Sequence, residues 1–118
     1  MTFSLATYES SASISTTERS LPADTTTGVP TSQTDDGYWQ AMLDLNALAA
    51  GDEFIFQVYE KVQSAGTQRL VDSFSFVGSQ SRKHFLTIAF PLGHGWDMTL
   101  KKVSGTDRTI AWRITRVS

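Results

Sequence analysis

The sequence contains no cysteine, which excludes disulfides, thiol nucleophiles and Cys-based zinc sites. Neither charge sign dominates: 10 Lys and Arg against 12 Asp and Glu give a net charge of -2, with no overall basic field to hold a phosphate backbone. No apolar run approaches the roughly 18 residues of a membrane helix. The first ten residues lack the charged start and apolar run of a signal peptide. We therefore expect a soluble protein made under reducing conditions, with neither a membrane nor a nucleic acid as its main partner.

The 118 residues are 40% apolar and 11% aromatic, enough for one compact core and too few for two domains. Their distribution is uneven, because roughly half of residues 1–34 are Ser or Thr. This composition predicts an extended N-terminal arm, with a possible edge strand ending near Leu21. If the arm clips onto a partner, its anchors are its larger apolar side chains, namely Phe3, Leu5, Tyr8 and Ile14.

Residues 35–118 show a different pattern, in which apolar side chains alternate with polar ones. Turn residues separate the alternating segments, and no sustained helical periodicity appears. Besides the arm, the segments fall near residues 38–45, 54–60, 70–77, 85–90, 96–100 and 110–114. The sequence thus predicts an all-β domain of about seven strands, an antiparallel β-sandwich or jelly-roll-like fold that follows the arm.

The aromatic residues allow two interpretations. Trp39, Trp96 and Trp112 have the chemistry of a sugar-stacking platform, but each falls on the apolar face of its strand, which favours core packing. Tyr38 and Tyr59 fall opposite their apolar neighbours. They are the better candidates for exposed contacts with a partner.

No catalytic or metal-binding motif appears in the sequence. The pair Asp35-Asp36 precedes a glycine, as in turns, and lacks the spacing of an EF-hand loop, which leaves calcium a minor alternative. His84 and His94 have no metal-ligand spacing to each other. No G-x-S-x-G elbow supports a serine nucleophile. We expect no enzyme activity, no cofactor and no metal.

The C-terminal part is locally basic, and Asp107 is its main opposing charge. Two interpretations stay open: a solvated strand face, or pairing of arginines with carboxylates of a neighbouring subunit. The residues concerned are Lys101, Lys102, Arg108, Arg113 and Arg116. Of these, Arg108, Arg113 and Arg116 are the candidate partner-binding residues.

Five short stretches carry a resemblance to known proteins: residues 59–62 (YEKV), 66–69 (GTQR), 95–101 (GWDMTLK), 105–108 (GTDR) and 112–114 (WRI). With them, residues 36–117 resemble a family of small virion proteins of tailed bacteriophages, most closely the capsid decoration (cement) proteins. These are fold and turn residues, and the arm lies outside the resemblance.

The resemblance implies a β-rich, non-enzymatic subunit that binds and stabilises the shell of the major capsid protein. It also implies a location on the capsid surface of the virion, synthesis in the host cytoplasm, and contact with further copies of itself. A head-to-tail connector or tail protein is the alternative within virions. A carbohydrate-binding β-sandwich is the alternative from another class, and it requires exposed aromatic rings.

Overall fold

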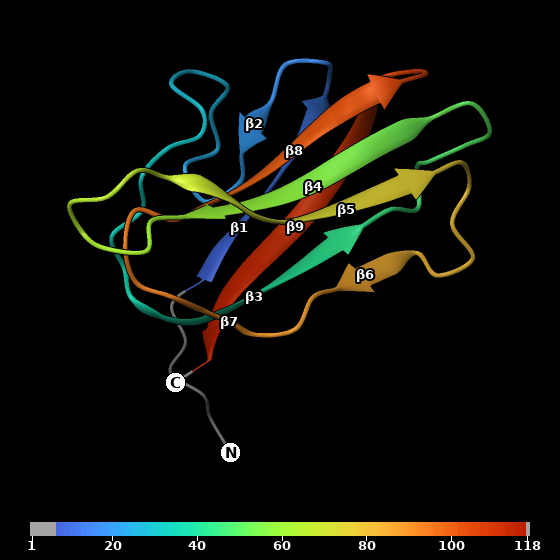
Figure 1. Cartoon of the computed structure of the whole chain (residues 1–118). Helices are drawn as coiled ribbons and strands as arrows, with labels where there is room; N and C mark the ends of the chain where they lie inside the picture. The colour runs from blue at the N-terminus through green and yellow to red at the C-terminus, as the bar shows by residue number, and fades with distance from the viewer. Residues whose placement is uncertain (1–6, 118) are drawn as a thin grey trace.

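The computed structural model describes residues 7–117, which contain nine strands and no helix (Figure 1). The strands are β1 (Thr7–Ile14), β2 (Arg19–Ser20), β3 (Gly37–Asp44), β4 (Glu53–Glu60), β5 (Arg69–Val77), β6 (His84–Leu86), β7 (Phe90–Leu92), β8 (Asp97–Ser104) and β9 (Arg108–Val117). All pairings are antiparallel. The predicted all-β, antiparallel sandwich is confirmed. The count exceeds seven because β2, β6 and β7 have only two or three residues each.

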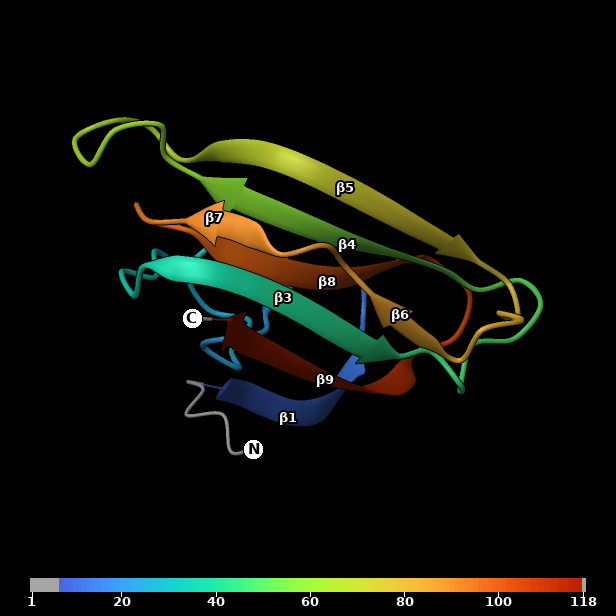
Figure 2. The same cartoon turned by 90° about the horizontal axis from the view of Figure 1, so that it is seen from below.

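The strands form two layers, which Figure 2 shows from below. The first sheet, sheet A, has the order β1-β9-β3-β6, with β7 also paired to β3. The second sheet, sheet B, has the order β2-β8-β4-β5. In sheet B the two-residue β2 is one edge and the nine-residue β5 is the other.

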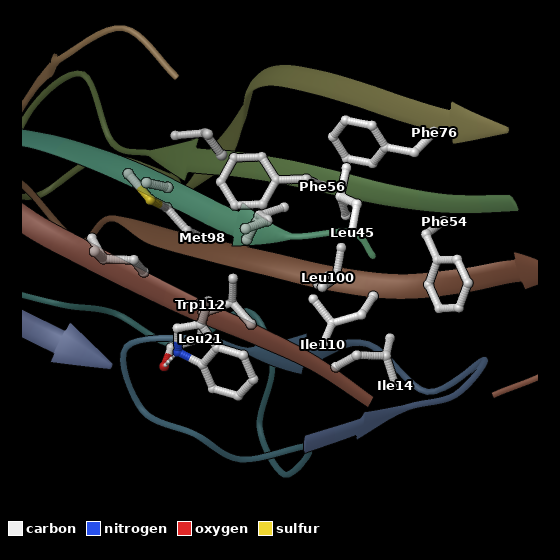
Figure 3. Close-up of a cluster of buried hydrophobic side chains, with 14 of the residues drawn as sticks. Ile14, Leu21, Leu45, Phe54, Phe56, Phe76, Met98, Leu100, Ile110 and Trp112 are labelled. Atoms are coloured by element: carbon white, nitrogen blue, oxygen red, sulfur yellow. Dashed lines mark hydrogen bonds between the residues drawn. The ribbon is translucent and has the colours of Figure 1, made fainter. Parts of the chain in front are cut away.

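The core lies between the layers and follows the predicted alternation. In β4, Phe54, Phe56 and Val58 are fully buried, while the residues between them are only half-buried. Trp39 in β3 and Trp112 in β9 are also buried, so the prediction that the tryptophans pack in the core is confirmed. Figure 3 shows part of this cluster, to which side chains of both sheets contribute.

Residues 7–34 lie on the domain, and the possible edge strand expected before Leu21 is present as β1 at the edge of sheet A. Strand β1 pairs with β9 along its whole length, from Thr7 opposite Thr115 to Ile14 opposite Arg108. Ile14 and Leu21 are each only 1% exposed. Small Ser and Thr side chains suit an edge strand, and a few buried apolar side chains together with main-chain hydrogen bonds anchor the segment.

The segment that contains β2 covers part of the outward face of sheet B. Asp97 and Thr99 alternate with the core residues Met98 and Leu100, so they point away from the core, yet both are fully buried. The Ser20 hydroxyl donates to Asp97 at 2.8 Å, and the Thr31 N–H donates to the same carboxyl group at 2.7 Å. Burial raises the pKa of Asp97, against the effect of these hydrogen bonds. Residues 18–34 therefore cover this part of sheet B.

Indole N–H groups hold the same segment from the core side. Trp39 and Trp96, with ring centroids 4.9 Å apart, both donate to the carbonyl oxygen of Asp35, at 3.1 and 2.7 Å. Trp112 donates to the carbonyl oxygen of Leu21 at 3.0 Å. The tryptophans thus bury their rings in the core and use their single polar group to fix the N-terminal segment.

Candidate interaction surfaces

No segment within residues 7–117 covers the outward face of sheet A, and we call it the open face. Its rows follow from the strand register: Glu9, Arg113, Met42 and Leu86 in one row, and Ser11, Ala111, Asp44 and His84 in the next. Every one of these side chains is exposed or half-buried. Sheet B lacks an equivalent surface at Asp97 and Thr99, which residues 18–34 bury.

A shallow hollow of about 230 Å³ lies near the middle of the open face. It forms because the methyl group of Ala111 is surrounded by longer side chains. Charged groups of both signs line it: Glu9 and Arg113 are direct neighbours across β1 and β9, and Asp44 lies beside His84 across β3 and β6. Such a surface suits recognition of a polar protein surface better than enclosure of a small ligand.

A second surface is the narrow side of the sandwich where β5 and β6 lie, which we call the apolar side. Five of the eight large apolar side chains that are exposed among the described residues belong to it. They are Leu70 (51% exposed), Val71 (54%), Val77 (68%), Leu86 (53%) and Ile88 (73%). By strand alternation Leu86 projects from the outward face of sheet A and Val77 from that of sheet B, so these side chains border the apolar side from both faces and do not form one patch.

Aromatic packing beneath the apolar side joins the two sheets. The ring centroid of Phe85 in sheet A lies 5.2 Å from that of Phe74 and 4.8 Å from that of Phe76, both in β5. Phe56 of β4 lies 6.1 Å from Phe74. These contacts fix the position of the edge strand β5, so that its outer side is presented on a firm base.

Two of the four predicted arm anchors lie within the described residues, and both pack on the domain itself. Phe3 and Leu5 lie outside the described residues. The Tyr8 ring packs against Trp39 at 5.4 Å, and its hydroxyl donates to Asp35. Burial and this hydrogen bond raise the pKa of Tyr8 to about 12. Ile14 lies in the core and is not an external anchor.

Three other predicted contact residues also have partners within the chain. Tyr59 donates to Glu18 at 2.9 Å, and burial together with this bond raises its pKa to about 12. The guanidinium of Arg116 lies 5.8 Å from the ring centroid of Trp39, within reach of a cation–π contact. Arg108 forms an ion pair with Asp52, described next.

The Arg108–Asp52 pair joins two turns of the sandwich. The Arg108 Nε atom lies 2.7 Å from one carboxylate oxygen of Asp52, which also accepts a hydrogen bond from the Ala49 N–H at 2.9 Å. The Thr106 N–H donates to the other oxygen at 3.0 Å. The Arg108 hydrogen bond, followed by those from Thr106 and Ala49, lowers the pKa of Asp52 to about 2. Arg108 thus stabilises the fold of its own chain.

Two predicted contact residues lie on the outer surface. Arg113 is exposed on the open face, where its guanidinium approaches the Met42 sulfur at 3.7 Å. Tyr38, 57% exposed, lies at the end of the same face and pairs with Pro91 and Val117. Sequence reasoning missed the exposed valines of β5. The available signal was that Val71 and Val77 alternate out of phase with Phe74 and Phe76.

Within residues 7–117, no cluster of three or more His, Asp or Glu side chains has the arrangement to hold a metal ion. The same residues include no helix suited to crossing a membrane. Comparison of the chain with family models, with curated proteins and with solved structures found no match.

Proposed function

We propose that the chain is a non-enzymatic structural protein of a tailed-phage virion, a decoration protein that binds the shell of the major capsid protein. The resemblance of residues 36–117 to capsid decoration proteins indicates this class of protein. The observation that supports it best is the open face, a rigid and uncovered sheet surface that spans β1, β9, β3 and β6. In the proposed role, this face binds the shell of the major capsid protein.

The physical argument rests on what a shell-binding subunit requires. It needs a broad surface held in one shape, because ordering a flexible surface on binding costs free energy. The strands of the open face have their inward side chains in a closed core, so their outward side chains keep fixed spacings. Arg113 provides a planar donor for carboxylates, and Tyr38 provides an exposed aromatic contact.

The carbohydrate-binding alternative receives less support. Its platform would be built from tryptophans, and the three indole rings are between 0% and 3% exposed. A connector or tail role would use the same kind of protein-binding face. The two virion roles are therefore separated by the partner that binds and not by the chemistry of the face.

The test is co-sedimentation of the purified protein with undecorated phage capsids in compact and expanded states. We expect saturable binding by the wild-type chain. Arg113→Glu reverses a charge on the open face, and we expect at least tenfold weaker binding. The matched control is Arg82→Glu, because Arg82 is also exposed but lies in the loop before β6.

No binding of the wild-type chain to capsids in either state would refute the decoration role. Binding to isolated tails or connectors in the same assay would favour the alternative within virions. Equal weakening by the Arg113 and Arg82 variants would show that the open face is not the docking surface, even if the chain binds capsids. Both variants need the far-UV circular dichroism of the wild type for the comparison to hold.

A further inference from the structure

Strand β5 is a long edge strand whose outer side has no partner among the described residues. Its nine residues pair only with β4, and Figure 2 shows β5 at the margin of the molecule with no other segment beyond it. An edge of this length offers a row of main-chain N–H and C=O groups to another strand. The other edge of sheet B, β2, has only two residues.

Devices that discourage pairing occur in the first part of β5 only. Arg69 and Asp72 bring charges, and the register against β4 shifts between Val58 and Tyr59, which leaves Val71 as a bulged residue. From Ser73 to Val77 the ladder is regular and carries no charge. The unprotected part of the edge is thus its C-terminal end, from Ser73 to Val77.

We propose that a second copy of this chain pairs with β5, antiparallel and about a two-fold axis at Phe74. In an antiparallel ladder alternate residues direct both main-chain groups to the same neighbour. A two-fold axis that passes through one residue satisfies this rule. Ser73 then lies opposite Ser75 of the other copy, and both residues direct their main-chain N–H and C=O groups to the same side of the strand. Sheet B becomes an eight-stranded sheet that runs through both copies.

Side-chain complementarity selects this register among the symmetric ones. The axis at Phe74 brings Val71, which lies at the bulge just beyond the regular ladder, to the level of Val77 of the other copy, twice, so that aliphatic side chains that are 54% and 68% exposed come near each other. The small pair Ser73 and Ser75 lies between them. An axis one residue later places Val77 opposite Ser73 and leaves Val71 without a partner.

The exposed apolar side chains near the edge of sheet A are not needed for this contact. Leu86 projects from the open face and is 53% exposed, and Ile88, 73% exposed, lies in the loop between β6 and β7. This interface uses none of the charged residues of the open face, so it does not depend on the proposed function, and a dimer leaves that face free.

The test uses two double variants with opposite expected results, measured by sedimentation equilibrium over a hundredfold concentration range. Ser73→Lys with Ser75→Lys places like charges opposite each other, and we expect the dimer mass of the wild type to fall to the monomer mass. Ser73→Lys with Ser75→Glu places opposite charges in both symmetric pairs, and we expect the dimer to persist.

The matched control is Ser11→Lys with Ser13→Lys in β1. This is also a Ser-x-Ser pair, exposed on an edge strand, but of sheet A. We expect this variant to keep the dimer. Thermal unfolding of each variant monitors folding independently of mass. A monomeric wild type at all concentrations overturns the proposal. So does a dimer that both β5 variants retain, that both lose, or that the β1 control loses.

Discussion

Replacement of Leu21 by alanine tests whether the Ser/Thr-rich N-terminal segment is part of the cooperative fold. Leu21 is 1% exposed and lies in the core cluster, although it comes from a segment whose composition predicts an arm. The substitution removes three buried carbon atoms, at ~0.8 kcal/mol each, or ~2.4 kcal/mol of transfer free energy. The residual cavity raises the cost, and measured Leu-to-Ala losses of ~2.7–5 kcal/mol set the range.

We therefore expect Leu21→Ala to lower the free energy of unfolding by about 3 kcal/mol. A chain of 118 residues has a total stability of roughly 6–18 kcal/mol, so the loss is a substantial share. At about 4 °C per kcal/mol for a domain of this size, Tm falls by about 12 °C. Urea titration followed by tryptophan fluorescence and circular dichroism measures the change, with coincident transitions as the check for two-state unfolding.

The control is Leu86→Ala, because Leu86 is 53% exposed and its truncation leaves no closed cavity. We expect it to cost less than about 1 kcal/mol. If Leu21→Ala changes the unfolding free energy no more than Leu86→Ala does, the segment does not belong to the cooperative unit. The placement of residues 15–34 on the sandwich would then have to be abandoned.

Two further predictions concern the turns joined by Asp52. Since the pKa of Asp52 is lowered from 3.8 to about 2 in the fold, its contribution to stability is present above pH 4 and is lost as the pH falls through about 2. Urea midpoints between pH 2 and pH 6 are expected to fall less steeply for Asp52→Asn than for the wild type, and parallel curves would contradict this role. Gly105 has a φ of +93°, and an added Cβ lies 2.3 Å from Asp52 Oδ1 and 2.7 Å from its Cα atom. Gly105→Ala is therefore expected to cost about 1–3 kcal/mol in urea unfolding. Gly28→Ala, also at positive φ but with no atom within 4 Å, is expected to cost less, and equal costs would remove the argument from the contact with Asp52.

The resemblance of residues 36–117 to phage decoration proteins remains a prediction, and the co-sedimentation experiment is its direct test. The structural features that bear on this prediction are the open face and the apolar side. A rigid open face and an apolar side are what a subunit needs if it is to contact two different neighbours. The variants at Arg113 and at Ser73 and Ser75 address these two surfaces separately.

For the candidate contact residues, the sequence predicted the direction of the side chain but not its partner. It placed Arg113 and Tyr38 in strands, with side chains directed away from the apolar face, and both lie on the outer surface. It could not separate them from Arg108 and Tyr59, which follow the same local pattern. Arg108 meets Asp52 and Tyr59 meets Glu18, and both partners lie more than 40 residues away in the chain. Local alternation shows which way a side chain points but not what it meets.

The fold class could be predicted from the amino-acid sequence, because a period of two, turn residues between short segments and the absence of helical periodicity depend on neighbouring residues alone. The burial of the three tryptophans in the core could also be predicted in this way. By contrast, the pairing of β1 with β9, and the cover that residues 18–34 give to sheet B but not to sheet A, are visible only in the folded chain. These outcomes rest on pairings between residues far apart in the chain, such as Ser20 with Asp97 and Leu21 with Trp112. Ser and Thr side chains satisfy a free tail and an edge strand equally well, so composition could not distinguish the two until the partner strand was in place.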